Sequence, residues 1–129
     1  MVRRILALGT VLAVATAAGA LAASSGLYTG NTSQKLSITV KVSKGQVVKV
    51  DYVAKFRSCG ELSAVDKLKI AIKGGKFSAT VHPNSEAVDK LTGRFKGQAV
   101  SGTLSSVVML GGIHPSTCRT GKVTFSAKL

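Results

Sequence analysis

Residues 47–56 read Val-Val-Lys-Val-Asp-Tyr-Val-Ala-Lys-Phe and determine the predicted fold class, because apolar and polar side chains alternate along them. One face of this segment carries Val48, Val50, Tyr52, Ala54 and Phe56. The other face carries Lys49, Asp51, Val53 and Lys55. A period of two is typical of a half-buried β-strand, with one face toward a core and the other toward water.

The same alternation extends outward from this segment over most of the chain. It recurs at residues 36–42, 68–72, 77–81, 91–95, 100–108 and 123–129, and no stretch after Ala22 shows a helical period. With a short first strand near residues 27–30, we expect eight strands. The strands over 47–57 and 99–110 are long for a small domain and should coil or bend, with Gly102 a natural place. The sequence therefore predicts an all-β antiparallel meander that forms a β-sandwich or a flattened barrel.

The alternation also predicts how neighbouring strands align, because directly opposed residues must point to the same face of a sheet. The predicted opposed pairs are Val42–Val48, Ile72–Phe77 and Phe95–Val100, across loops of residues 44–46, 74–75 and 97–98. Glycines in these loops supply the positive φ angles that tight hairpin turns require.

Residues 1–22 have the pattern of a secretory signal peptide. Arg3 and Arg4 precede an uncharged apolar run, and Ala20-Leu21-Ala22 carries small residues at the positions that signal peptidase accepts. A membrane anchor fits less well, because the run is rich in Ala and Gly and no positive stop follows it. We expect cleavage after Ala22, which leaves one secreted all-β domain of residues 23–129.

The mature domain is strongly basic and holds two cysteines. The full chain has a formal net charge of +13, and loss of two arginines with the signal peptide leaves 13 − 2 = +11. Cys59 and Cys118 both lie in the exported part, where an even cysteine count predicts a disulfide. Two cysteines and two scattered histidines are too few for a zinc site, so we expect neither metal nor cofactor.

The predicted alignment places Lys41 opposite Lys49 and Lys35 opposite Lys55 on the polar face. Like charges opposed across strands are unfavourable, so we interpret these four lysines as a candidate surface for an anionic partner. The alternative is that they only protect exposed strands against aggregation. The anionic partner would be a cell-wall polymer or a membrane surface. Nucleic acid fits poorly, because the chain has no Trp and only 5% aromatic residues.

Few residues point to catalysis. We expect Glu61 and Asp66 to share a loop beside the disulfide, and we interpret them as loop residues rather than as paired catalytic carboxylates. No motif of a nucleophile with its base is present, so an enzyme ranks third among the readings. A barrel that carries a small ligand is the second reading, although the tryptophans of lipocalins and avidins are missing.

Several short segments resemble a group of small secreted proteins from high-GC Gram-positive bacteria. They are residues 28–34, 75–78, 93–97, 101–104 and 118–121, which are mainly turns and strand starts. The resemblance implies a disulfide-bonded β-domain and carries over no catalytic residue. We therefore expect an exported, monomeric, non-catalytic binding or structural module at the cell envelope.

Overall fold

The computed structural model describes residues 23–113 and 115–129, and the predicted signal peptide lies outside this part of the chain. The described residues form nine strands and no helix, which confirms the all-β prediction. The strands are β1 (Gly26–Thr32), β2 (Ser37–Ser43), β3 (Gln46–Phe56), β4 (Gly60–Ala71), β5 (Lys76–Val81), β6 (Ala87–Lys96), β7 (Ala99–Leu110), β8 (Ser116–Arg119) and β9 (Val123–Lys128). Within these ranges, no helix is long and apolar enough to cross a bilayer.

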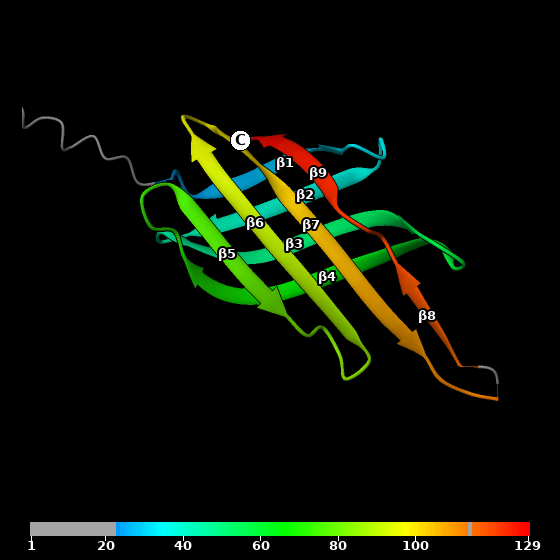
Figure 1. Cartoon of the computed structure of the whole chain (residues 1–129). Helices are drawn as coiled ribbons and strands as arrows, with labels where there is room; N and C mark the ends of the chain where they lie inside the picture. The colour runs from blue at the N-terminus through cyan, green and yellow to red at the C-terminus, as the bar shows by residue number, and fades with distance from the viewer. Residues whose placement is uncertain (1–22, 114) are drawn as a thin grey trace, which may run out of the picture.

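The strands form one antiparallel sheet in the order β4-β3-β2-β1-β9-β7-β6-β5, and β8 pairs with β7 (Figure 1). Strands next to each other in sequence are mostly neighbours in the sheet, as in the predicted meander. The exceptions are β4 and β5, which lie at opposite ends of the order, and β9, which does not pair with β8. Strand β9 pairs instead with both β1 and β7 and thereby joins the first and last strands of the domain.

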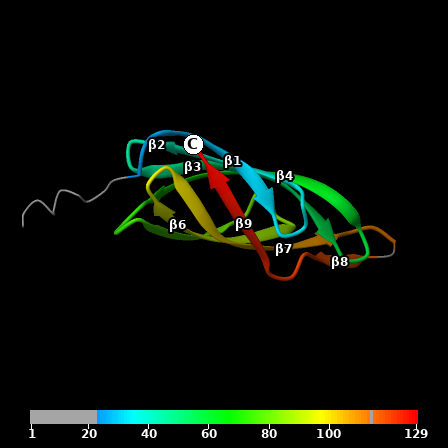
Figure 2. The same cartoon turned by 90° about the horizontal axis from the view of Figure 1, so that it is seen from above.

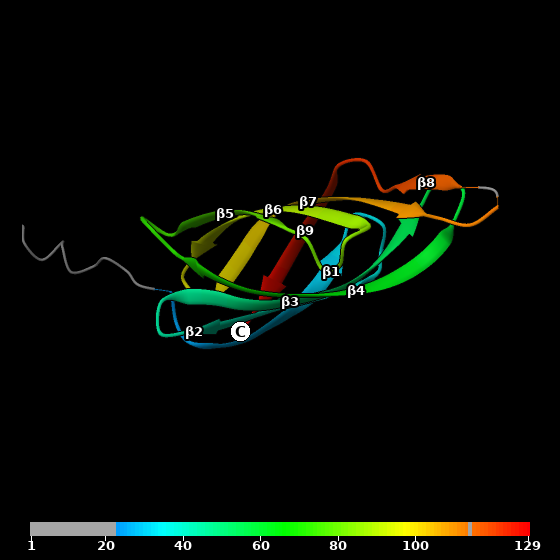
Figure 3. The same cartoon turned by 90° about the horizontal axis from the view of Figure 1, so that it is seen from below.

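The sheet folds over on itself into a flattened, nearly closed barrel. One layer holds β1 to β4 and the other holds β5, β6, β7 and β9, and the strands of the two layers cross (Figure 1). Views from above and below show the two layers facing each other (Figures 2 and 3). The seam lies between β4 and β5, which are linked in sequence by the Gly74-Gly75 hairpin and by an isolated bridge between Lys73 and Lys76.

The core fills the space between the layers with side chains from almost every strand. Tyr28, Ile38, Val50, Leu91 and Leu104 are each at most 1% exposed. The ring of Tyr28 meets that of Phe95 edge to face, with centroids 5.2 Å apart, and its hydroxyl donates to the Ser24 carbonyl oxygen at 2.8 Å. Burial of such large apolar side chains supplies the main driving force for closing the sheet.

Two of the three predicted hairpin alignments hold. Phe95 lies directly opposite Val100, and Lys73 opposite Lys76 fixes the two-residue Gly74-Gly75 turn.

The first hairpin alignment is wrong by one residue, because Val42 lies opposite Val47 rather than Val48. The turn has only two residues, Lys44 and Gly45, both with positive φ, which matches the twist of the flanking strands. The extra residue forms a β-bulge at Val48, so Val47 faces the core and Lys41 still lies opposite Lys49.

The strands differ from those expected in two ways, and only the first changes their number from eight to nine. β8, a short strand that pairs with β7, was not predicted. In addition, residues 60–67 belong to β4, which continues as one long strand where we expected a loop. Its pairing with β3 starts at Gly60, opposite Phe56, so Glu61 and Asp66 lie on a strand.

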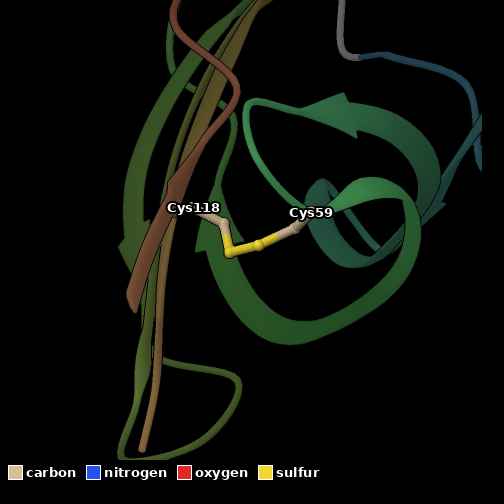
Figure 4. The surroundings of a disulfide bond; sticks show 2 residues. All are labelled: Cys59 and Cys118. Carbon is tan, nitrogen blue, oxygen red and sulfur yellow. A yellow bond between two sulfur atoms is a disulfide. The ribbon is translucent and has the colours of Figure 1, made fainter. Parts of the chain in front are cut away.

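The predicted disulfide is present and joins the two layers (Figure 4). Cys59 lies in the turn between β3 and β4, and Cys118 lies in β8 with its Cα atom 5.9 Å from that of Cys59. A backbone hydrogen bond from Arg57 to Arg119 (2.8 Å) supports the same junction. A cross-link over 59 residues should contribute about 4 kcal/mol by restricting the unfolded chain.

Gly102 is required by close backbone packing between β6 and β7. A Cβ atom at this position would lie 1.9 Å from the carbonyl oxygen of Thr92 and 2.8 Å from the Cα atom of Gly93. Both obstacles are backbone atoms, which cannot move aside as a flexible side chain can. Any side chain here would push the two strands apart.

We therefore expect Gly102→Ala to lower the free energy of unfolding by about 1–3 kcal/mol, the usual cost of overpacking. The matched control is Ser101→Ala on the exposed side of the same strand, which should change stability by less than about 0.5 kcal/mol. Urea denaturation of the oxidised protein measures both. Equal effects of the two substitutions would contradict this account of Gly102.

Candidate functional site

Two of the four lysines predicted to bind an anion lie opposite each other on neighbouring strands, as expected. Lys41 on β2 lies opposite Lys49 on β3, and Lys49 lies opposite Lys67 on β4. The three lysines thus form a row across three adjacent strands. Leu27, 53% exposed, lies opposite Lys41 on β1 and extends the row.

Lys35 and Lys55 do not form the predicted opposed pair. Lys35 lies in the turn between β1 and β2 with a φ of 64°, and its N–H donates to the Thr32 carbonyl oxygen at 2.8 Å. The backbone of Lys55 is bound instead by the Gln34 side chain, whose Oε1 accepts from the Lys55 N–H at 2.8 Å. The turn has replaced the strand extension on which the prediction depended.

The lysine row is partly neutralised by an acid. Lys49 Nζ lies 3.7 Å from Asp51 Oδ2, and both side chains are about two-fifths exposed. An exposed pair of this kind contributes at most about 1 kcal/mol to stability. Asp51 also lines the shallow hollow of about 600 Å³ beside Lys41 and Lys49, so this hollow is not uniformly positive.

A larger and more uniformly basic hollow, of about 1010 Å³, lies at the β4–β5 hairpin and over β5, β6, β7 and β9. Its charged side chains are those of Lys73, Lys76 and Arg94, all exposed, and no acidic residue lines it among the described residues. We call this surface the basic hollow. Lys76 lies directly opposite both Lys73 and Arg94, so three cations are concentrated at one end of the hollow.

Hydroxyl groups form a row along the basic hollow. Ser78, Thr92, Thr103 and Thr124 lie opposite one another on β5, β6, β7 and β9. The Thr92 and Thr103 hydroxyl oxygens are 2.7 Å apart and share a hydrogen bond. Because cross-strand neighbours are about 4.5–5.5 Å apart, the row presents regularly spaced donors and acceptors beside the cations.

Comparisons with known proteins give no family. No family model matches the chain, and neither the curated proteins nor the solved structures give a significant match.

The interior holds a pair of buried carboxyl groups that the sequence analysis did not predict. Asp66 on β4 is 0% exposed and Asp89 on β6 is 1% exposed. Tyr52 on β3 donates its hydroxyl to Asp89 Oδ2 at 2.8 Å, and Ser106 lies opposite Asp89 on β7. Asp89 Oδ1 and both carboxyl oxygens of Asp66 have no hydrogen-bond donor other than the proton that Asp66 can hold between the two groups. We call Asp66 and Asp89 the carboxyl pair.

The pKa of Asp66 is raised to about 8, mainly by burial and also by hydrogen bonding and charge repulsion from the neighbouring Asp89 carboxyl. Asp51 adds a smaller repulsion. Burial likewise raises the pKa of Tyr52, so its hydroxyl keeps its proton and remains a donor to Asp89. At neutral pH Asp66 therefore largely retains its proton.

Asp89 lines a cavity of about 390 Å³ at the seam, whereas Asp66 is not among the described residues that line it. Polar groups come from Ser63, Asn84, Asp89 and Ser106, and much of the apolar wall comes from Phe56, Leu62 and Val108. Among the described residues, no three side chains of His, Cys, Asp or Glu gather as metal ligands would.

A sequence signal for the carboxyl pair was available in the alternation itself. Asp66 has the same parity as Leu68 and Ile70, and Asp89 has the same parity as Leu91. Each aspartate therefore lies two residues before an apolar residue that faces the core, and points to the same side of its strand. Asp66 was instead assigned to a loop, and Asp89 was not predicted to face the core.

The raised pKa of Asp66 predicts a distinctive pH dependence of stability. Between about pH 4, where an unfolded aspartate ionises, and about pH 8, the folded protein retains a proton that the unfolded chain has released. The folded state thus binds more protons in this window. The free energy of unfolding should therefore fall as the pH rises from about 4 to about 8.

Asp66→Asn should remove this dependence and raise stability at pH 8, because the amide is neutral and has the shape of the protonated acid. Urea denaturation at pH 5, 6, 7 and 8 measures the effect. The control Glu61→Gln, on an exposed side chain of the same strand, should leave the slope unchanged. A wild-type stability that rises with pH over this range would contradict the assignment.

Proposed function

We propose that this chain is an exported, non-catalytic module that binds an anionic polymer at the cell envelope through the basic hollow. The observation that carries the proposal is the clustering of Lys73, Lys76 and Arg94 at a hollow with no acidic lining residue among those described. Opposed like charges are unfavourable in the free protein, and an anionic partner relieves that repulsion.

A polymer fits the basic hollow better than a single small anion does. The cations lie on exposed strands rather than in an enclosed pocket, and the hydroxyl row continues from them across four strands. Such an arrangement can bind successive charged and hydroxyl groups along a chain. The net charge of 13 − 2 = +11 on the mature domain adds a long-range attraction for polyanions and raises the rate of encounter.

The disulfide supports the proposed location. Disulfides form and persist in oxidising compartments such as the space outside the cytoplasmic membrane. The Cys59–Cys118 bond lies at the junction of the two layers, with Cys118 fully buried.

The double substitution Lys76→Glu with Arg94→Glu should weaken binding to poly-L-glutamate or polyphosphate by about tenfold or more. Each basic side chain near an anionic surface contributes on the order of 1 kcal/mol, and reversal adds repulsion. Retention and affinity are measured on immobilised polymer across a salt series. Binding of the wild type should weaken steeply as the Debye length shortens from ~30 Å at 0.01 M to ~8 Å at 0.15 M salt.

Two matched variants separate this surface from the others. Lys41→Glu with Lys67→Glu makes the same change in net charge on the lysine row and should weaken binding less. Lys128→Glu, opposite the uncharged Thr29 and Ala99, should have a minor effect. Failure of the wild type to bind either polymer at 0.01 M salt would refute the proposal. Retention on vesicles with anionic lipid, without retention on polymer, would indicate a membrane surface instead.

A further inference from the structure

The cavity at the seam brings an unpaired buried oxygen together with an apolar wall. Asp89 is 1% exposed, lines the cavity, and uses Oδ2 to accept from Tyr52, while Oδ1 has no donor other than the proton of Asp66. A buried carboxylate oxygen without a partner is costly, and such groups are normally paired or hydrogen-bonded. The geometry therefore leaves room for a donor that comes from outside the chain.

The missing donor should be a cation. No lysine, arginine or histidine is among the described residues that line the cavity, so the protein supplies no positive partner for Asp89. Asp66 lies beside Asp89, and its own two oxygens also lack donors. A positive charge in the cavity beside Asp89 would give its carboxyl group a charge-assisted hydrogen bond.

The rest of the lining favours an organic cation over a metal ion. Phe56, Leu62, Ala64, Ala87 and Val108 give the cavity a mainly apolar wall. Hard metal ions need several oxygen ligands, and the described residues offer no group of three potential metal-ligating side chains. A volume of about 390 Å³ lies within the range of small-molecule sites.

We propose that this cavity binds a small organic amine, whose ammonium group donates to Asp89 and whose apolar part packs against Phe56, Leu62 and Val108. The site is separate from the basic hollow, and it shares no lining residue with that hollow. The barrel would thus carry a small ligand in its interior in addition to the polymer on its surface.

Binding at this site should release a proton. The titratable groups that face the carboxyl pair are Tyr52 from β3 and the two aspartates themselves, with Asp51 acting from the outer side of β3. All are acidic groups, so an incoming ammonium is the first positive charge at the site. It favours the ionised form of Asp66, whose proton, held near neutral pH, passes to solvent.

The test uses benzylamine as the probe and benzyl alcohol as its neutral counterpart, each titrated into the folded, oxidised protein by calorimetry at pH 7. We expect benzylamine to bind with a dissociation constant of about 1 mM or tighter, and benzyl alcohol to bind at least about tenfold more weakly. Repeating the titration in buffers of different ionisation enthalpy measures the proton released. Equal binding of the two probes would overturn the proposal.

Three variants locate the ligand. Asp89→Asn should reduce benzylamine affinity by about tenfold or more, because it removes the charge that the ammonium meets. Ala64→Leu fills the cavity from β4 without changing either carboxyl group, and should also reduce binding; it keeps the test valid if the first variant does not fold. Asp66→Asn should still bind but release no proton.

Unchanged affinity in both Asp89→Asn and Ala64→Leu would exclude this cavity, and loss of binding in Asp66→Asn would exclude Asp89 as the main anchor.

Two further measurements distinguish the amine site from a metal site and from the polymer-binding surface. Millimolar MgCl₂ or CaCl₂ should not displace benzylamine beyond the effect of NaCl at equal ionic strength; specific displacement would indicate a metal site and overturn the amine. Added NaCl should slightly strengthen amine binding, because it screens repulsion from the positive protein, whereas it weakens polymer binding. The Lys76→Glu, Arg94→Glu variant should retain amine binding, so each proposal can fail without the other.

Discussion

The pairing of the first and last strands is the contact on which the rest of the barrel depends. β9 lies between β1 and β7 and hydrogen-bonds to both, so it turns two separate meanders into one sheet. This approach is close: a Cβ atom at Gly30 would lie 1.9 Å from the carbonyl oxygen of Ser126. The two layers can face each other across one core only because a glycine stands here.

Closure at β1 and β9 determines where the barrel stays open. With the terminal strands paired, the weakly bonded seam falls between β4 and β5, which diverge from the Gly74-Gly75 hairpin. Asp66 faces the interior from β4 and Asp89 from β6, next to β5, so the carboxyl pair lies close to this seam. The basic hollow begins at the hairpin itself. The basic hollow and the interior cavity therefore both lie where they do because the barrel is open between β4 and β5.

Local alternation along the sequence was enough to predict every strand except β8, most hairpins and the inward side chains of Tyr52 and Leu104. It failed where information had to come from elsewhere in the fold. A bulge at Val48 costs little and lets a two-residue turn fit, so periodicity alone could not distinguish the two alignments. The carboxyl pair was missed because aspartate is rarely buried. Asp66 on β4 and Asp89 on β6 come together only across the seam, because these two strands do not pair.

The disulfide has a consequence for how this barrel can open. Cys59 follows Phe56, and Cys118 pairs with Val108, so the bond ties together two walls of the interior cavity from opposite layers. With that tether intact, the layers cannot hinge apart at this end of the seam. Amide hydrogens of β4 and β7 near the bond should then exchange with solvent mainly through global unfolding, and reduction would convert this region into a separately opening unit.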